Sequence, residues 1–288
     1  MRQRIGEMFR FGERSKQGGG FEFTKIEDEH NAAKAEHLTV VYGGGEKAFE
    51  AVKDISLEIP KGQFLAIVGK SGSGKTTLIM TLAGLSIEKD GKPIKDIHAS
   101  GKVNLPGRMR FVFQNFSMWP HLNVRQHLDL MYKGEDFPYA KKLKKQISPL
   151  ATEIEIAEMM DLLGLEKQAN KYGDQMSGGE KRRVGFATQL MADADTLFMD
   201  EPFSSLDTET KEDMHELLLK VREHDHRKTM VMVTHDLREA LLLSERIAIM
   251  KEGKITDDVK VPFPYPRDVN LKYQPELIEI EKRLSKTL

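Results

Sequence analysis

The middle of the chain carries short runs of apolar residues separated by glycine-rich or charged segments. Phe64–Val68 is a continuous apolar run, which is typical of a strand buried on both faces of a sheet. Residues 86–113 are turn-rich and strand-like, and they end in an apolar triplet. Further strands are expected at Leu38–Tyr42, Ile55–Ile59, Thr196–Met199, Thr229–Thr234 and Arg246–Met250.

Apolar residues at helical spacing occur between and after these strands. Helices are expected near residues 75–83, 123–133, 152–163, 208–223, 236–243 and 275–286. Strands that alternate with helices predict an α/β fold, in which a mostly parallel sheet has helices on both faces. A proline-rich segment at 261–268 is expected to connect the body of the fold to the final helix.

The first 35 residues differ in character and are predicted to form a flexible extension. Residues 18–20 are all glycine, which favours a break in regular structure. Before that break, basic residues outnumber acidic ones, and Ile5, Met8 and Phe9 can share one helical face. Two interpretations stay open: a basic amphipathic helix on an anionic membrane surface, or a disordered tail.

Composition narrows the classes of function. The 288 residues are 39% hydrophobic and 31% charged, a globular balance with enough apolar material for a core. A formal net charge of -1 gives no global positive field, so no nucleic-acid partner is expected. The absence of cysteine excludes disulfides and thiolate metal sites. No run of about 18 apolar residues occurs, so no membrane-spanning helix is expected. The lysine-rich stretch at 141–145 is interpreted as a solvated face.

A glycine-rich segment follows directly after the buried strand. Gly69–Thr76 reads GKSGSGKT and matches the pattern GxxxxGK[ST] of phosphate-binding loops. Glycines let the backbone wrap a phosphate with N–H groups pointing inward, and the following helix presents its positive end. Lys75 adds a charge at the β- and γ-phosphates, and Thr76 offers a hydroxyl to Mg²⁺. The residues expected to contact the nucleotide here are Gly69, Lys70, Ser71, Gly72, Ser73, Gly74, Lys75, Thr76 and Thr77.

A second acidic element is needed for the metal. The apolar strand expected at 196–199 runs into Asp200, and Glu201 follows it. Asp200 is expected to hold Mg²⁺ through a water molecule, because hard cations prefer oxygen ligands. Glu201 is placed to polarise an attacking water as general base. Acids often end strands, so this pair is informative only because a phosphate-binding loop accompanies it.

Met176–Glu180 reads MSGGE and resembles the LSGGQ signature of ABC ATPases. Ser177 precedes Asp200 by 23 residues, as in that family. The remaining family elements occur in the family's order along residues 36–260. They are Tyr42 for the adenine-stacking aromatic, Gln114 for the Q-loop glutamine, Ser205–Asp207 for the D-loop and His235 for the switch histidine.

This resemblance implies a fold and a division of the chain. The fold is a P-loop NTPase core with a mostly parallel sheet, an antiparallel β subdomain and an inserted α-helical subdomain at 116–190. The ATPase domain is expected at 36–260, after the extension at 1–35. A C-terminal connector and helix are expected at 261–288.

The resemblance also implies ATP hydrolysis shared between two copies. Two subunits pack head to tail, and each ATP, with Mg²⁺, lies between the phosphate loop of one copy and the signature of the other. The expected catalytic residues are Lys75, Gln114, Glu201 and His235. The expected magnesium ligands are Thr76, Gln114 and Asp200. Nucleotide contacts beyond the loop are expected from Tyr42, Ser177, Gly178, Gly179, Glu180 and Asp207.

Three positions depart from the commonest family pattern. Met176 replaces leucine, an apolar change of similar volume. Glu180 replaces glutamine, as in many members of the family. Thr188 stands where the family usually has arginine, which puts one local polar contact in doubt.

The resemblance further implies partners and a location. An ATPase chain without a membrane segment implies separate permease subunits and a peripheral position on the cytoplasmic face of the membrane. Residues 234–250 and the tail after 261 resemble the nitrate/sulfonate/taurine importers, which implies a solute-binding protein as well. Phe116 and Trp119 are expected either to anchor a helix of the permease or to pack inside the helical subdomain. An ATPase of lipid or lipoprotein export, and a soluble non-transport ABC ATPase, remain the alternatives.

Overall fold

The computed structural model covers the whole chain, and its placed residues include most of the expected elements. It describes residues 20–45, 48–85, 88–89, 92–93, 96–112, 121–132, 156–158, 160–162, 164–190, 194–204 and 206–288. Several predictions concern residues outside these ranges: those for the first 19 residues, Gln114, Phe116, Trp119, the lysines at 141–145 and Ser205.

The larger of the sheets has six strands in the order β12-β11-β4-β10-β9-β8. Neighbouring strands are parallel throughout, except that β12 pairs antiparallel with β11 at one edge. This confirms the predicted mostly parallel sheet. Its strands are β4 (Phe64–Val68), β8 (Met109–Val112), β9 (Thr196–Asp200), β10 (Thr229–Thr234), β11 (Arg246–Lys251) and β12 (Lys254–Lys260).

The central strand β4 shows why the apolar runs of this chain are continuous. All five of its side chains are buried. Phe64, Ala66 and Val68 belong to the hydrophobic core on one face of the sheet. Leu65 and Ile67 belong to the core on the other face. Successive strand residues point to opposite faces, so a strand covered on both sides needs apolar residues at every position.

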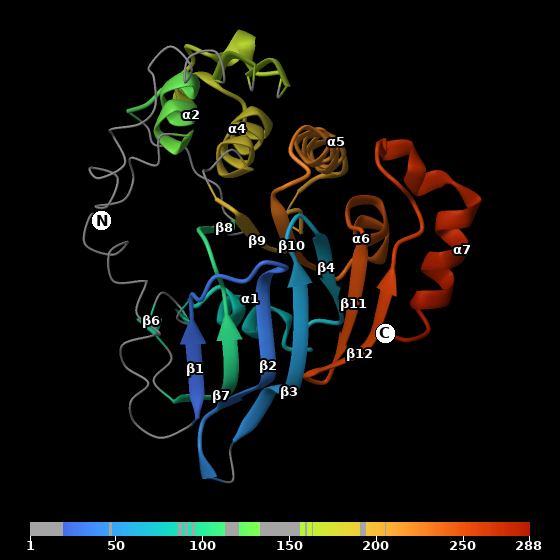
Figure 1. Cartoon of the computed structure of the whole chain (residues 1–288). Coiled ribbons are helices and arrows are strands. Elements are labelled where there is room, and N and C mark those ends of the chain that lie inside the picture. The colour runs from blue at the N-terminus through green and yellow to red at the C-terminus, as the bar shows by residue number, and fades with distance from the viewer. Residues whose placement is uncertain are drawn as a thin grey trace.

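Helices cover one face of this sheet and supply most of the first core. In Figure 1, α2 and α4 lie together at the top of the view, and α6 and α7 lie on the right. The helices are α2 (Val124–Tyr132), α4 (Gly178–Leu190), α5 (Thr208–His224), α6 (Leu237–Leu243) and α7 (Pro275–Leu284). Short 3-10 turns occur at η3 (Glu166–Gln168), η4 (Gly173–Gln175) and η5 (Val269–Tyr273). Between residues 116 and 190, the described residues form helices, turns and one isolated bridge, with no strand.

The second core lies between the six-stranded sheet and a four-stranded sheet of order β1-β7-β2-β3. Helix α1 (Lys75–Leu82) contacts strands of both sheets and contributes Leu78, Ile79 and Leu82 to this core. Strand β2 is antiparallel to both β3 and β7, as the expected β subdomain requires. The strands are β1 (Phe21–Thr24), β2 (Asn31–Tyr42), β3 (Phe49–Pro60) and β7 (Ile97–Asn104), with a small hairpin of β5 (Glu88–Lys89) and β6 (Lys92–Pro93).

The N-terminal boundary of this β subdomain was placed too late by the sequence. Residues 20–35 were expected in a flexible extension, but β1 and the first part of β2 lie there. Strand β1 pairs in parallel with β7, and the Thr24 hydroxyl donates to Asn104 Oδ1 at 2.9 Å. Ala33 and Ala35 are buried in the second core. Small side chains and long-range pairing hold this segment, and neither produces a strong hydrophobic pattern.

The C-terminal segment, residues 261–288, packs along α6. Its connector contains a cis peptide bond between Tyr265 and Pro266, and η5 and α7 follow. Leu277 and Leu284 of α7 are buried in the first core, and α7 contacts α6 and η5. None of the described helices combines the length and the apolar character that a membrane span requires.

Candidate functional site

Parallel strands bring the predicted site residues to one edge of the six-stranded sheet. Strands β4, β10 and β9 are adjacent and parallel, so their carboxyl ends lie together. The glycine-rich loop follows β4, Asp200 ends β9 and His235 follows β10. In open α/β sheets, ligands bind beyond the carboxyl ends of the strands.

The glycine-rich loop lies so close to neighbouring backbone that two of its positions exclude any side chain. A Cβ on Gly69 would lie 2.2 Å from the Met250 carbonyl oxygen. A Cβ on Gly74 would lie 2.0 Å from the Ala51 carbonyl oxygen, and Gly74 has a φ of +99. Gly253 N–H also donates to the Ser73 carbonyl at 3.0 Å. The loop is therefore clamped between β3 and the β11–β12 turn, while Lys70, Ser71 and Gly72 stay exposed.

Lys75 carries a buried cation that has only weak compensation. Its Nζ donates to the carbonyl oxygens of Gly69 at 2.8 Å and Lys70 at 3.0 Å. Burial lowers the pKa of the Lys75 ammonium, and the charges of Glu201 and Asp200 oppose that shift. An anionic group placed in this loop would supply the missing countercharge. Within the described residues, Ser73 Oγ is also buried without a hydrogen-bond partner.

Two oxygen ligands suited to a hard cation lie close together, one at the start of α1 and one at the end of β9. Thr76 Oγ1 donates to Asp200 Oδ1 at 3.1 Å. Burial raises the pKa of the Asp200 carboxyl, the Thr76 hydroxyl opposes this, and the Glu201 charge adds to the rise. A cation at this point would relieve the cost of the buried carboxylate. Mg²⁺ typically takes one or two protein oxygens together with phosphate oxygens and water, so this donor pair fits it.

Glu201 and His235 face each other beyond the strand ends. Glu201 adopts a φ of +44, and its N–H donates to the Val233 carbonyl at 3.0 Å. A left-handed backbone costs a non-glycine residue about 1 kcal/mol or more, and such residues gather at functional sites. His235 Nδ1 lies 3.4 Å from Glu201 Oε2, and both side chains are partly exposed. The carboxylate is thus accessible to a reacting group while one imidazole nitrogen lies beside it.

Tyr42 reaches the same site from the β subdomain. Its hydroxyl lies 2.7 Å from Thr77 Oγ1, one residue after Thr76 on α1. Burial raises the pKa of the Tyr42 phenol, and the hydrogen bond with Thr77 opposes the shift. The ring is half-buried and so retains an accessible part beside the loop.

The signature forms the start of α4 rather than part of the phosphate loop. Ser177 N–H donates to Glu180 Oε2 at 2.8 Å, and Glu180 N–H donates to Ser177 Oγ at 3.2 Å. This reciprocal pair is a capping box. The Ser177 N–H bond and the contact with Lys171 lower the pKa of the Glu180 carboxyl to about 2. In the part of the chain that the structure describes, neither residue is bonded to the loop, and a Cβ on Gly178 would meet nothing within 4 Å.

The remaining predicted positions have local roles in the structure. Asp207 caps α5 by accepting from Thr210 N–H at 2.9 Å and from Thr210 Oγ1 at 2.8 Å. Met176 is buried in the first core, as its apolar character requires. Thr188 is buried too, and its hydroxyl donates to the Gly185 carbonyl at 2.7 Å. The Thr188 hydroxyl is therefore satisfied within α4 itself.

Sequence reasoning missed the residues that surround His235. Thr234 and Glu239 are buried and hydrogen-bonded to each other, and Asp236 caps α6 through the N–H groups of Arg238 and Glu239. A signal was present, because an acid at the cap followed three residues later by glutamate marks a helix start. The partners of Glu239 on α5, Lys211 and His215, are distant in sequence and give no comparable local signal.

The chain is similar in sequence to several proteins that are described as import ATP-binding proteins. The family described as ABC transporter matches residues 52–204. An aliphatic sulfonates import ATP-binding protein of Paracoccus denitrificans is 37% identical over 235 residues, which cover 82% of this chain and 86% of that protein. A nitrate import ATP-binding protein of Synechococcus elongatus is 34% identical, with 76% and 77% covered. A sulfate/thiosulfate import ATP-binding protein of Bacillus cereus is 36% identical, but the match covers 72% of this chain and 56% of that protein.

Solved structures give the same picture. A dimeric ATP-binding cassette in a post-hydrolysis state, bound to ADP and Pi, has a TM-score of 0.55 and 28% sequence identity, and the match covers 81% of this chain and all of that chain. A second dimeric cassette has a TM-score of 0.58 and 27% identity, with 81% of this chain covered.

Proposed function

This chain belongs to the ABC transporter family of ATP-binding proteins, and we propose that it powers the import of a small sulfonate- or nitrate-like solute. ATP hydrolysis is the activity of the cassette itself. The similar proteins named for sulfonate, nitrate and sulfate import support import as its use. Permease subunits would carry the solute, with a solute-binding protein delivering it, and this chain would lie on the cytoplasmic face of the membrane.

The proposal rests on the way Lys75, the Thr76–Asp200 pair and the Glu201–His235 pair come together at the carboxyl ends of β4, β9 and β10. Lys75 would exchange its loop carbonyls for phosphate oxygens of ATP. Thr76 and Asp200 would hold Mg²⁺, which supplies positive charge to the phosphates when bound. Positioning and electrostatic stabilisation provide most of the rate enhancement in phosphoryl transfer.

Glu201 and His235 would act on the attacking water and the terminal phosphate. The partly exposed Glu201 carboxylate can accept a proton from water, and its left-handed backbone fixes the direction of the side chain. The imidazole of His235, 3.4 Å away, would orient the γ-phosphate. Tyr42 would stack on adenine beside α1. Gln114 keeps its expected role as a magnesium ligand, as a proposal from sequence.

A second copy would complete the site. Ser177, Gly178, Gly179 and Glu180 start α4 and share no bond with the loop of their own chain within the described residues. The open space around Gly178 leaves the helix N-terminus accessible to a phosphate from another subunit. Asp207 would lie near the contact between the two copies. The dimeric cassettes among the similar structures support the participation of a second copy.

The role of Glu201 is tested by Glu201→Gln, which keeps the shape of the side chain but removes the base. We expect ATP hydrolysis to fall by at least about 100-fold, because general-base catalysis is worth 10²–10⁴. Nucleotide affinity should be retained, and the variant should dimerise in ATP, as measured by light scattering. Glu216→Gln, in an exposed ion pair on α5, is the matched control. Wild-type turnover in Glu201→Gln would refute the assignment.

The import proposal is tested in cells and by purification. Copurification of the chain with an integral membrane protein would support a transporter subunit. Uptake of a labelled alkanesulfonate and of nitrate should then depend on the ATPase activity of this chain. Uptake of both solutes that is unaffected by Glu201→Gln would contradict the assignment of cargo.

A further inference from the structure

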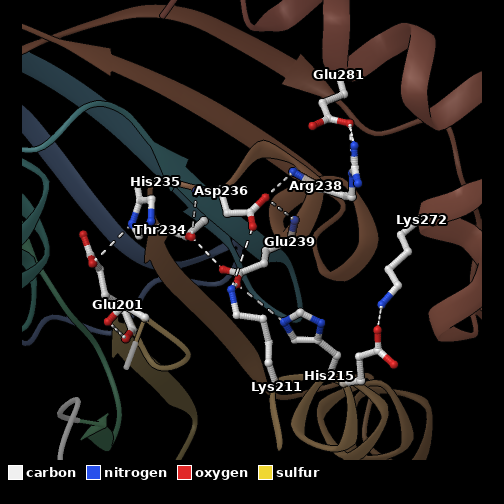
Figure 2. A network of polar contacts seen from close by, with 12 residues as sticks. Glu201, Lys211, His215, Thr234, His235, Asp236, Arg238, Glu239, Lys272 and Glu281 are labelled. Atoms are coloured by element: carbon white, nitrogen blue, oxygen red, sulfur yellow. Dashed lines mark hydrogen bonds and ion pairs between the residues drawn. The ribbon is translucent and has the colours of Figure 1, made fainter. Parts of the chain in front are cut away.

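A buried polar cluster joins the turn that carries His235 to helix α5 (Figure 2). We call it the Glu239 cluster, and it consists of Lys211 and His215 on α5, Thr234 at the end of β10 and Glu239 on α6. Thr234, His215 and Glu239 are at most 5% exposed. Lys211 is partly exposed, with 28% of its side chain accessible. Three polar side chains in the interior need a reason, because burial of unpaired polar groups is costly.

The Glu239 carboxylate fixes the backbone on both sides of His235. Thr234 Oγ1 donates to Glu239 Oε2 at 2.7 Å. The same Thr234 oxygen accepts from the Asp236 N–H at 3.0 Å. His235 therefore lies between two residues that are tied to one another and, through Thr234, to the carboxylate. Its own side chain leaves this frame toward Glu201 (Figure 2).

Helix α5 in turn holds the carboxylate. Lys211 Nζ lies 2.6 Å from Glu239 Oε1 and 3.9 Å from Asp236 Oδ2. His215 Nε2 lies 3.7 Å from Glu239 Oε1, an electrostatic contact too long for a hydrogen bond. Burial alone would raise the pKa of Glu239, but the contacts from His215, Lys211 and Thr234 outweigh it and lower the pKa to about 2. Glu239 thus keeps its charge, and its contacts bind α5 to the turn.

The same histidine also touches the segment that follows Glu201. The His215 ring packs edge-on against Phe203, with ring centroids 4.7 Å apart. Phe203 is fully buried and comes two residues after Glu201. One side chain of α5 therefore contacts both chain segments that present the Glu201–His235 pair, and α5 itself begins at the Asp207 cap.

We propose that Glu239 is a positioning residue for His235, and that its contacts with Lys211 and His215 make helix α5 and the β10–α6 turn move as one unit. This inference rests on the proposed role of His235 in ATP hydrolysis. It extends that role to residues that touch neither nucleotide nor metal. A change at the N-terminus of α5 would reach His235 through this cluster.

The test replaces the carboxylate with its uncharged isostere in Glu239→Gln. The single amide oxygen could then accept from Lys211 or from Thr234 but not from both, and the negative charge facing Lys211 would be lost, so the cluster should rearrange. We expect kcat for ATP hydrolysis to fall about tenfold, since small misplacements of catalytic groups cost one to two orders of magnitude. KM for ATP should change less than about twofold, because the phosphate loop is unaltered. Thr234→Val removes both bonds of the hydroxyl, to Glu239 and from the Asp236 N–H, and should also lower kcat.

A matched control separates positioning from simple loss of a buried carboxylate. Glu245 is half-buried at the other end of α6, where it pairs with Arg222 at 2.7 Å. Glu245→Gln should leave kcat within about twofold of wild type. In a His235→Ala background, Glu239→Gln should have little further effect, because both changes act through the same group. Independent, multiplying effects in the double variant would overturn the proposal.

A spectroscopic readout keeps this test independent of ATP hydrolysis. The imidazole NMR signal of His235, assigned by its loss in His235→Ala, should shift in Glu239→Gln and stay in place in Glu245→Gln. If the wild-type chain failed to hydrolyse ATP, the proposed function would fail while this signal still reported on positioning. An unchanged His235 signal in Glu239→Gln and Thr234→Val would refute the positioning role, whatever the kinetics.

Discussion

The phosphate loop and the C-terminal segment each bury a cation, but they satisfy it in different ways. Among the residues that the structure describes, Lys75 donates to two carbonyls, both in its own loop. Arg267 donates to the carbonyl oxygens of Leu241, Leu242 and Ser244, at 3.3, 3.0 and 2.8 Å, and also to that of Phe263. Burial lowers the pKa of both cations.

The difference lies in what the carbonyls belong to. Three of those around Arg267, the carbonyls of Leu241, Leu242 and Ser244, are at the C-terminal end of α6, where unpaired carbonyls and the helix dipole favour a positive charge. The guanidinium also lies 4.3 Å from the centre of the Tyr265 ring. In the proposed function ATP would replace the contacts of Lys75, whereas the contacts of Arg267 would stay in place. Changes at the two cations should therefore separate activity from stability.

The largest effect is expected at the phosphate loop. Lys75→Met keeps the length of the side chain but removes its charge, and ATP hydrolysis should fall by about 10³-fold or more. The melting temperature should stay the same or rise, because a poorly compensated buried charge is removed. ATPase assays and thermal unfolding measure the two effects. Lys61→Met, in an exposed ion pair with Glu27, is the control for loss of a surface lysine.

A large loss of stability in Lys75→Met would break the comparison. It would mean that the two loop carbonyls hold Lys75 as a structural cation in the way that the end of α6 holds Arg267.

The opposite result is expected in the C-terminal segment. Arg267→Met should lower the free energy of unfolding by about 3 kcal/mol, because several buried carbonyls lose their donor. Affinity for ATP should not change in the folded fraction. Denaturant unfolding and nucleotide binding are the measurements. Arg227→Met is the matched control, since that side chain is 95% exposed and should alter stability little. Weakened ATP binding in folded Arg267→Met would show that the segment acts on the site.

A contrast between central and edge strands explains which parts of the fold could be predicted from sequence. Strands β4 and β10 lie at the centre of the sheet, and because they are buried on both faces, their residues form continuous apolar runs. Strand β12 was missed. It reads KITDDVK, none of its side chains is fully buried, and it is defined by pairing with β11 at the sheet edge. Ion pairs such as Arg246–Asp258, at 2.5 Å, hold it there and leave no hydrophobic pattern.

The candidate site divides along similar lines. The loop at Gly69–Thr76 could be found because its chemistry lies within eight consecutive residues. The capping box at Ser177 was not predicted, because residues 176–180 were interpreted only as the family signature. Glu239 and Arg267 could not be assigned, because their partners are set by packing. Lys211 lies 28 residues before Glu239, and Ser244, the residue that caps α6, lies 23 residues before Arg267. Contacts made across the fold leave no fixed spacing in sequence.

The smallest effect is expected at the signature, where Ser177 combines a structural role with a proposed role in binding ATP. Ser177 caps α4 within its own chain and is proposed to meet the ATP of a second copy. Ser177→Ala should lower the free energy of unfolding of the nucleotide-free chain by about 1 kcal/mol, the usual value of a serine cap. Ser177→Thr keeps the hydroxyl and should restore most of this loss. Unfolding curves without nucleotide isolate the cap from the dimer.

ATP-dependent dimerisation of the same two variants then reports on the other role of Ser177. In a Glu201→Gln background, Ser177→Ala should weaken the dimer because the hydroxyl that would meet the phosphate is gone. If Ser177→Ala lost stability but dimerised in ATP as well as its parent, the serine would be a helix cap alone. The signature would then belong with Arg267 among the structural devices of the fold, and the shared site would depend on the backbone of Gly178 and Gly179.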